Sequence, residues 1–397
     1  MSKRLSLLMI VIMLAATLLV ACGGAEYECE DEWGCATFEE GDKIKVGYVG
    51  PMTGDYSAYG IDISRGAELA LVGHPEVLGF EIELVIEDTQ GTPEQGASVA
   101  NMLAADPQIV AVDGHTFSGS TEVAIPIYEE AGVVMMSPSA TTPDLTRQGY
   151  MVFNRVAFHD EMQGKFAAEY LYNILGVRSI AIMHDGGAYG QPLAEMTGEF
   201  FKDLGGTVVG GEAVTPGETD YSAPLAAIGA LEPELIYYGG YDTDAAVLVT
   251  QMEAAGLGDA LFFGCDGTYG ENYLDLAGEA AEGTFSTYVP IPESAAFNTF
   301  RFDYQAAYGD PQGKLSPFSP HGHDAMAILI NAIEDVAIEH GKSLVIPRKA
   351  LADQVRATSG WVGLTGEINC SDTGECAAAA IRFMEVQGGE WGVGPGQ

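Results

Sequence analysis

The stretch AVDGHTFSGSTEVAIPIYEEAGVVMMSPSATTPD, residues 111–144, decides the fold. Within it, Ala111–Asp113 and Gly132–Met136 are short apolar runs of the kind that form buried parallel strands. The residues between these runs, Thr121–Ala131, have the length of a crossover helix. Two parallel strands need such a crossover to connect them. The stretch therefore predicts a β-α-β unit of an open parallel sheet.

Small hydroxyl residues follow both predicted strands. The first cluster comprises Ser118, Gly119, Ser120 and Thr121, and the second comprises Ser137, Ser139, Thr141 and Thr142. In open α/β sheets, ligands bind in the crevice outside the carboxyl ends of the strands. A helix that begins at Ser118 or Ser120 would present backbone N–H groups there, which suit a carboxylate. Ordinary helix caps and turn serines give the same residue pattern, so the rest of the chain has to decide between the two interpretations.

The chain is strongly acidic and rich in apolar residues. Its 397 residues include 57 acidic and 17 basic side chains, a formal net charge of −40, and 47% hydrophobic residues. The length suits two domains, and the apolar content excludes a disordered protein. Nucleic acids and anionic membrane surfaces bind clusters of Lys and Arg, so neither is expected as a partner.

The first residues have the features of a bacterial targeting segment. Lys3 and Arg4 precede the apolar run Leu5–Val20, and the sequence LVACG around Cys22 resembles the lipobox at which lipoproteins are cleaved and lipidated. We expect residues 1–21 to be a lipoprotein signal peptide and Cys22 to carry the lipid. One acylated cysteine holds a protein at a membrane surface without spanning the membrane. The expected location is therefore exported, at the cell surface or in the periplasm. An uncleaved anchor helix and an unlipidated signal are the alternatives.

The remaining five cysteines divide into two local pairs and one single residue. Cys29 and Cys35 are six residues apart in a polar segment, and Cys370 and Cys376 have the same spacing. Outside the cytoplasm, two local disulfides are the simplest arrangement. A zinc site is the alternative, but CxxC spacing and flanking histidines are missing. Cys265 stays unpaired, and it either lines a cleft or packs as a small apolar side chain.

Predicted strands and helices alternate along most of the chain. The pattern begins with a strand at Lys43–Val49 and continues through a loop at Gly50–Gly60 and a helix at Ser64–Val72. It includes strands at Ser179–His184 and Thr207–Ala213 and repeats up to a strand at Gly283–Val289. Unbroken alternation of this kind predicts parallel sheets with helices on both faces. The two series of repeats predict an α/β protein with two doubly wound parallel-sheet lobes.

The chain is expected to pass between these lobes more than once. Helical patterns follow the last of these strands, and a late strand is predicted near the C-terminus. The end of the chain would then return to both lobes, which hinge strands would join. We expect residues 22–42 to be an acidic linker. The first lobe would comprise residues 43–159 and 290–367, and the second would comprise residues 160–289 and 368–397.

Signatures of enzymes and of cofactor-binding proteins are missing. Around Ser118 the sequence TFSGS lacks the first glycine of GxSxG, so it does not form a nucleophile elbow. His184 and the pair His321 and His323 have no third residue at metal-ligand or catalytic spacing. The glycines of the loop at Gly50–Gly60 do not have GxGxxG spacing, and a Walker A sequence is absent. The sequence predicts no enzyme, no metal and no cofactor.

Four tyrosines and one acid are expected at the sheet edges where ligands bind. Tyr59, Tyr189, Tyr241 and Tyr269 all fall in predicted loops after strands. Aromatic side chains in this position give a pocket an apolar wall with polar tips. Asp266 also follows a predicted strand and would place a carboxylate at the same edge. An acid that faces an anion site suits a zwitterion with an ammonium and a carboxylate group.

Six motifs in one order resemble the bacterial leucine/isoleucine/valine-binding proteins, which are the type I solute-binding proteins of branched-chain amino acid ABC importers. These motifs are IKVGYVGPMTGDYSAYG, GHTFSGST, MSPSATTPDLT, IMHDGGAYG, IYYGGYD and FFGCDG. The resemblance covers most of Lys43–Pro290. It implies a periplasmic binding protein-like type I fold, a small amino acid as ligand and the permease subunits of an ABC transporter as partners.

The resemblance also implies a ligand site built from both lobes. Its residues would be Tyr59, Phe117, Ser118, Ser139, Ala140, Thr141, Tyr189, Tyr241, Asp266 and Phe318. In the family, the matching hydroxyl residues hold the ligand carboxylate and ammonium, and the matching tyrosines close the pocket. Asp266 would pair with the ammonium, and Phe318 would touch the ligand side chain. The family acid is commonly glutamate and the residue matching Phe117 is smaller, so the side-chain pocket is expected to be smaller or flatter here.

Together, these features predict a monomeric, lipid-anchored receptor that closes on an amino acid of the leucine, isoleucine and valine class and delivers it to an ABC permease. A receptor of the same fold for amides, urea-like or aromatic-acid ligands is one alternative. A ligand sensor for a membrane signalling protein is another. An exported hydrolase would need a nucleophile–base pair, which the sequence does not show.

Overall fold

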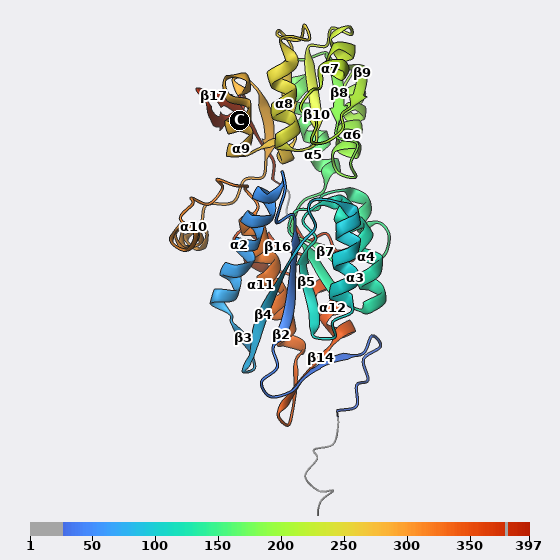
Figure 1. Cartoon of the computed structure of the whole chain (residues 1–397), viewed down its shortest axis with the longest axis vertical. Coiled ribbons are helices and arrows are strands. Elements are labelled where there is room, and N and C mark those ends of the chain that lie inside the picture. The colour runs from blue at the N-terminus through green and yellow to red at the C-terminus, as the bar shows by residue number, and fades with distance from the viewer. Residues whose placement is uncertain (1–26, 378–379) are drawn as a thin grey trace, which may run out of the picture.

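Two α/β lobes lie one above the other along the long axis of the molecule (Figure 1). The computed structural model describes residues 27–377 and 380–397. The expected signal peptide, Cys22 and the start of the expected linker lie outside the described residues. Among the residues that are described, every helix is too short or too polar to cross a membrane. The lobe with the six-stranded sheet is called the first lobe below, and the lobe with the seven-stranded sheet is called the second lobe.

The first lobe is built on a mainly parallel sheet with the strand order β3-β4-β2-β5-β6-β7, in which β3 runs antiparallel to β4. Its strands are β2 (Ile44–Gly50), β3 (Glu76–Val77), β4 (Phe80–Asp88), β5 (Ile109–Gly114), β6 (Val134–Ser137) and β7 (Phe153–Arg155). Helices α2 (Ser57–Gly73) and α11 (Ser319–Val336) share one apolar core with this sheet. Helices α3 (Pro93–Ala104) and α4 (Ser118–Ala131) share another. The strand β5 is therefore buried between two helical layers.

The second lobe has the strand order β18-β17-β12-β11-β10-β8-β9, in which β17 and β18 run antiparallel to their neighbours. Its strands are β8 (Ser179–His184), β9 (Thr207–Ala213), β10 (Leu235–Gly239), β11 (Leu261–Gly264), β12 (Phe285–Tyr288), β17 (Arg382–Gln387) and β18 (Glu390–Val393). Helices α5 (Asp160–Asn173) and α6 (Gly190–Asp203) pack in one apolar core. Helices α7 (Ser222–Gly229), α8 (Asp242–Met252) and α9 (Glu271–Ala277) pack in another. This sheet is also covered on both faces.

Short elements complete the two lobes. Helix α10 (Ala295–Tyr308) stands at the side of the molecule near the junction of the lobes (Figure 1), and its Tyr304 hydroxyl donates a hydrogen bond to Asp62 of α2 at 2.9 Å. Strands β15 (Trp361–Gly363) and β16 (Gly366–Ile368) form a separate antiparallel pair. Three 3₁₀-helices, at Pro143–Thr146, Asp266–Thr268 and Gly278–Ala281, lie in the connections after strands or helices.

The predicted fold class is confirmed, because both sheets are mainly parallel and carry helices on both faces. Strands β8 and β9 begin and end at the predicted residues. The predicted crossover unit is present as β5, α4 and β6, and the helix begins three residues earlier than predicted, at Ser118. Central parallel strands are apolar on both faces, so their positions are visible in the sequence.

Helix α2 differs from the prediction. It begins at Ser57 instead of Ser64, so Tyr59 lies in the first turn of a helix and not in a loop. The glycine-rich sequence before Ser64 favours a loop. Gly60 has a different role here, because a Cβ atom at this position would lie 2.0 Å from the Pro51 carbonyl oxygen. Glycine therefore allows the start of the helix to pack directly against the preceding turn.

The segment predicted as an acidic linker also contains regular structure. Strand β1 (Cys35–Phe38) pairs antiparallel with β14 (Ser343–Pro347), and β13 (Ile338–His340) completes a small sheet. The Asp31 carboxylate accepts hydrogen bonds from the backbone N–H groups of Lys349 and Ala350, both at 3.0 Å, at the start of α12 (Arg348–Arg356). The described part of the segment is therefore docked on the first lobe.

Both predicted disulfides are confirmed. Cys29 is bonded to Cys35, and Cys370 is bonded to Cys376. Cys265 is buried and has no disulfide partner, and its thiol donates a hydrogen bond to the Gly240 carbonyl oxygen at 3.1 Å.

Candidate functional site

Side chains of the first lobe make hydrogen bonds and a ring contact with the second lobe. The Tyr59 hydroxyl donates a hydrogen bond to the Gly267 carbonyl oxygen at 2.6 Å, and the Thr142 hydroxyl donates one to the Ala188 carbonyl oxygen at 2.6 Å. The Phe117 ring of the first lobe stacks on the Tyr241 ring of the second, with ring centroids 4.4 Å apart. These contacts describe a closed arrangement of the two lobes.

A cavity of about 20 Å³ lies at this junction. Its lining residues come from both lobes and are Tyr59, Phe117, Ser118, Ser139, Tyr189, Tyr241, Asp266, Gly267 and Phe318. Eight of the ten residues expected at the ligand site therefore line this one cavity. The other two, Ala140 and Thr141, are buried next to Ser139 in the chain and are not part of the lining. Tyr269 lies elsewhere, because its ring packs against Tyr288 and Trp391.

Four of the aromatic lining residues occupy the same local position, the residue just before a helix. Phe117, Tyr189, Tyr241 and Phe318 precede α4, α6, α8 and α11, respectively, and none of these helix starts has a side-chain cap. A capping side chain would accept hydrogen bonds from the first-turn N–H groups, which an aromatic ring does not do. The connections that lead into these four helices therefore supply both aromatic rings and helix N-termini at the cavity.

The hydroxyl groups of the first lobe have different capacities for a ligand. The Ser118 oxygen accepts a hydrogen bond from the Thr142 N–H at 3.4 Å, so its own proton remains available to donate. The Ser139 hydroxyl donates to the Thr116 carbonyl oxygen at 2.7 Å, so it can only accept from a ligand. Ser118, at the first residue of α4, therefore suits a carboxylate, and Ser139 suits an ammonium.

Asp266 is the acidic group of the cavity wall. It lies in the 3₁₀-helix after β11, and its side chain is buried. Its Oδ1 accepts hydrogen bonds from the Tyr189 hydroxyl and from Gln163 Nε2, the latter at 2.8 Å. Burial raises the pKa of the Asp266 carboxyl, and hydrogen bonds from Tyr189, from Gln163 and from the adjacent backbone N–H groups oppose that rise. The carboxylate lines the cavity, and its two oxygens have more acceptor sites than these donors use, so it can also accept a hydrogen bond from a ligand.

Two residues next to Asp266 were not predicted from the sequence. Gln163 holds Asp266 from both sides, because its Oε1 also accepts from the Asp266 N–H at 3.0 Å. Asp160 is fully buried, and its Oδ2 has no hydrogen-bond partner among the described residues. Burial, and then the negative charge of Asp266, raise the pKa of the Asp160 carboxyl well above its usual value. Both residues occur in the first turn of α5, where the sequence shows an ordinary helix start.

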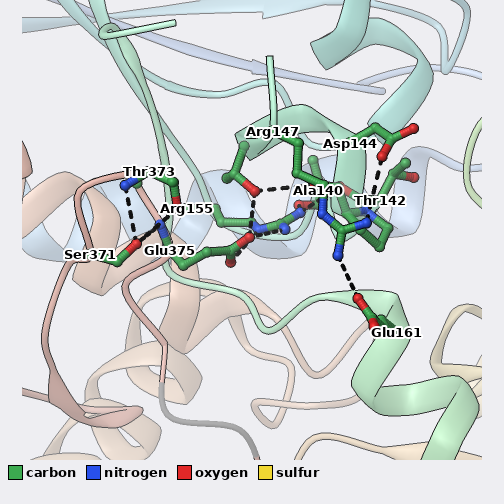
Figure 2. Close-up of polar contacts among 12 residues, drawn as sticks. Ala140, Thr142, Asp144, Arg147, Arg155, Glu161, Ser371, Thr373 and Glu375 are labelled. Carbon is green, nitrogen blue, oxygen red and sulfur yellow. Dashed lines mark hydrogen bonds and ion pairs between the residues drawn. The ribbon is translucent and has the colours of Figure 1, made fainter. Parts of the chain in front are cut away.

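Arg155 positions the loop that carries Ser139. Its guanidinium is fully buried, and its Nη1 donates to the carbonyl oxygens of Ala140 and Thr142 at 3.1 and 2.8 Å. Its Nε donates to Glu375 Oε2 at 2.8 Å, within the loop closed by the Cys370–Cys376 disulfide (Figure 2). Glu375 also accepts from the Thr146 hydroxyl at 2.6 Å. One ion pair therefore joins the hydroxyl loop of the site to a distant segment of the chain.

The predicted absence of a metal site can be examined in the described part of the chain. No group of three or more His, Cys, Asp or Glu side chains with the geometry of a metal site occurs there. His321 is buried, and burial lowers the pKa of its imidazole to about 4. The candidate site is a small cavity between the lobes, lined by aromatic rings, with neutral hydroxyl groups on one side and a carboxylate on the other.

Comparisons with known proteins agree with this geometry. Residues 43–390 match the family model described as periplasmic binding protein. The leucine-, isoleucine-, valine-, threonine- and alanine-binding protein of Pseudomonas aeruginosa is 32% identical over 298 residues, which are 74% of this chain and 78% of that protein. The Leu/Ile/Val-binding protein of Escherichia coli is 35% identical over 249 residues, which are 62% of this chain and 67% of that protein.

Solved structures are similar over most of the chain. The leucine-binding protein LivK of Thermotoga maritima has a TM-score of 0.80 and 28% identity, and the match covers 88% of this chain and 97% of that chain. LivJ of Streptococcus pneumoniae, a branched-chain amino acid transporter substrate-binding protein in complex with isoleucine, has a TM-score of 0.77 and 25% identity and covers 88% and 98%. All four similar proteins are named as binding proteins, in agreement with the prediction that this chain is a binding protein and not an enzyme.

Proposed function

We propose, because this chain belongs to the periplasmic binding protein family, that it is an extracytoplasmic receptor that captures a small amino acid between its lobes and delivers it to an ABC importer. The observation that carries the proposal is the pairing of groups across the cavity. The Ser118 hydroxyl at the start of α4 and the Asp266 carboxylate line the same closed space. An α-amino acid carries the two charges that such groups bind.

Each end of the ligand would have its own partners. The carboxylate would accept hydrogen bonds from the Ser118 hydroxyl and from first-turn N–H groups of α4. The ammonium would donate to Asp266 Oδ2 and to the Ser139 oxygen. Asp266 cannot turn away from the ligand easily, because Tyr189 and Gln163 hold its Oδ1. The site is therefore preorganised for a zwitterion.

The class of ligand follows from the names of the similar proteins. The protein of Thermotoga maritima is named for leucine, and that of Escherichia coli is named for leucine, isoleucine and valine. The name of the Pseudomonas aeruginosa protein adds threonine and alanine to these three. We therefore propose an aliphatic amino acid, and the branched-chain amino acids are the first ones to test.

The remaining features of the proposal concern the whole chain. The first lobe would comprise residues 43–159 and 290–367, and the second would comprise residues 160–289 and 368–397. Residues 1–21 would direct export, and a lipid on Cys22 would hold a monomeric receptor at the membrane surface. Closure of the lobes around the ligand would present the loaded form to the permease.

The aromatic residues that line the cavity also suggest a receptor for aromatic acids, but two observations disfavour this alternative. The Phe117 and Tyr241 centroids are 4.4 Å apart, which leaves no space for another ring between them. An aromatic acid has no ammonium for Asp266, which would then face the ligand as a buried carboxylate without a cation. The same argument disfavours neutral amides and urea-like ligands. A sensor subunit would bind the same ligand, and its partner would differ.

The proposal can be tested by isothermal titration of the purified protein with leucine, isoleucine, valine, threonine and alanine. Binding of at least one of them, with acetamide and benzoate showing none, is the expected result. Leucine methyl ester, which keeps the ammonium and loses the carboxylate, should bind much more weakly than leucine. Binding of benzoate or acetamide with no amino-acid binding would refute the proposal.

A further inference from the structure

We infer that Phe117 determines the ligand preference of this site, and that the preferred ligands are α-amino acids with side chains as short as that of alanine rather than that of leucine. The inference rests on the proposed function and narrows it. Its basis is the contact that Phe117 makes with Tyr241, where the walls of the two lobes meet at the cavity.

The volume of the closed cavity is the first argument. It measures about 20 Å³, whereas pockets for drug-sized ligands have on the order of 300–1,000 Å³. The polar partners proposed for the ligand, Ser118 and Asp266, line this same cavity. Any amino acid must place its carboxylate and ammonium there, whatever its side chain. A volume of about 20 Å³ is enough for about one water molecule, so the two lobes must separate to admit any amino acid, and they must separate further for the side chain of leucine than for that of alanine.

The position of the Phe117 ring is the second argument. This ring is 7% exposed, and its plane is inclined by 22° to the Tyr241 ring on which it stacks. One ring comes from the residue before α4 and the other from the residue before α8, so the stack joins the two lobes. A longer ligand side chain would have to separate these rings or keep the lobes from closing.

The contacts around the stack are the third argument, because they hold both rings in place. Tyr56 packs against Phe117 and Tyr241 with centroid distances of 5.6 and 5.0 Å, and Tyr59 packs against them at 5.9 and 6.0 Å. The hydroxyls of both tyrosines donate across the lobe junction, from Tyr56 to Asp244 at 3.3 Å and from Tyr59 to Gly267 at 2.6 Å. Rotation of Phe117 would disturb all these contacts at once.

Titration calorimetry with L-alanine, L-serine, L-valine and L-leucine tests the inference in the wild-type protein and in Phe117→Ala. The wild-type protein should bind alanine at least about tenfold more tightly than leucine, because single methylene groups in apolar pockets change affinity by on the order of tenfold or more. Phe117→Ala should reduce this ratio at least about tenfold or reverse it. Phe297→Ala is the matched control, since Phe297 is similarly buried but lies in α10 and does not line this cavity. This control should leave the ratio unchanged.

Phe117→Leu provides a second variant if Phe117→Ala does not fold, as judged by circular dichroism. It removes the flat ring and retains an apolar side chain, and it should shift the ratio in the same direction by a smaller factor. Tighter binding of leucine than of alanine by the wild-type protein would overturn the inference and leave the proposed function intact. An alanine-to-leucine ratio that no Phe117 variant changes would also overturn it. Failure of the wild-type protein to bind any amino acid would overturn the proposed function together with the inference.

Discussion

The two walls of the cavity differ in how they would recognise charge. The wall from the first lobe offers neutral groups, namely the hydroxyls of Ser118 and Ser139 and the backbone amides at the start of α4. The wall from the second lobe offers the carboxylate of Asp266, with the buried carboxyl of Asp160 behind it. Several neutral groups would contact the ligand from one wall, and a single charged group would contact it from the other. Substitutions in the second lobe should therefore cost far more affinity than those in the first.

The largest effect is expected from Asp266→Asn. The substitution keeps the shape of the side chain and removes the charge that would pair with the ligand ammonium. Truncating one partner of a buried charge pair costs on the order of 2–5 kcal/mol, which corresponds to a loss of affinity from about 30-fold to several thousand-fold. Calorimetric titration with the preferred amino acid measures this loss.

Asp185→Asn is a suitable control for this experiment, because Asp185 is also a buried acid of the second lobe but does not line the cavity. It should change affinity by less than about threefold. Equal affinities of Asp266→Asn and the wild-type protein would show that another group binds the ammonium and would remove the difference between the walls.

The pH dependence of binding should also reflect the second lobe. Burial raises the pKa of Asp266 in the empty site, and a bound ammonium would lower it again. Binding therefore releases a proton at pH values below the raised pKa, so affinity decreases as the pH falls through that range. The decrease can reach about tenfold per pH unit for one proton. Titrations from about pH 5 to about pH 8 in buffers of different ionisation enthalpy measure both the affinity and the released proton.

Asp160→Asn sharpens this prediction. The charge of Asp266 raises the pKa of the Asp160 carboxyl, so Asp160 is protonated while Asp266 titrates and contributes no charge of its own. The decrease in affinity should therefore begin at the same pH in Asp160→Asn as in the wild-type protein. A pH profile that is flat in the wild-type protein would contradict the raised pKa of Asp266.

A smaller effect is expected from Ser118→Ala in the first lobe. The substitution removes one hydroxyl donor to the ligand carboxylate and leaves the α4 amides in place. A hydrogen bond to a charged group contributes on the order of 1.5–3 kcal/mol, so affinity should fall by about 10- to 100-fold. Ser120→Ala is the control, because the Ser120 hydroxyl donates to the Phe117 carbonyl oxygen and does not line the cavity. A loss from Ser118→Ala as large as that from Asp266→Asn would contradict the proposed division between the walls.

The parts of the fold and the site that could be predicted are those whose signal is local in the sequence. Strands such as β8 and β9 were predicted because their apolar runs are local features of the sequence. Strand β1 was missed because its partner β14 lies about 300 residues away, and its own four residues carry little signal. Pairing with a distant strand is a property of the assembled lobe, and a short edge strand has no periodicity of its own.

The site residues follow the same rule. Ser118 and Asp266 were predicted since they directly follow strands, where parallel sheets place their ligands. Asp160 and Gln163 were not predicted, because both lie in the first turn of a helix whose sequence is ordinary. Their part in the site arises from the packing of α5 beside the loop that carries Asp266, which brings Gln163 to within hydrogen-bonding distance of it.

The smallest effect is expected from a hydrogen bond that joins the two lobes but whose residues do not line the cavity. The Tyr56 hydroxyl of the first lobe donates to Asp244 Oδ2 of the second at 3.3 Å, and the Tyr221 hydroxyl, which belongs to the second lobe, donates to Oδ1 of the same carboxylate at 2.6 Å. Tyr56→Phe would remove a hydrogen bond between the two lobes, and Tyr221→Phe would remove a hydrogen bond within the second lobe. The first substitution should reduce the closed population and weaken ligand binding about two- to tenfold, because a typical hydrogen bond contributes about 0.5–1.5 kcal/mol and this one is long, at 3.3 Å.

Comparison of Tyr56→Phe with Tyr221→Phe distinguishes an effect on closure of the lobes from an effect on recognition of the ligand. Small-angle X-ray scattering without ligand should show a more expanded Tyr56→Phe protein than wild type, whereas Tyr221→Phe should retain the wild-type dimensions and reduce only thermal stability. Since affinity for a closed-state ligand scales with the fraction of closed protein, the loss in Tyr56→Phe should be the same factor for every amino acid tested. A loss that differs between alanine and leucine would mean that Tyr56 acts on the ligand pocket through Phe117 and not on the equilibrium between open and closed lobes.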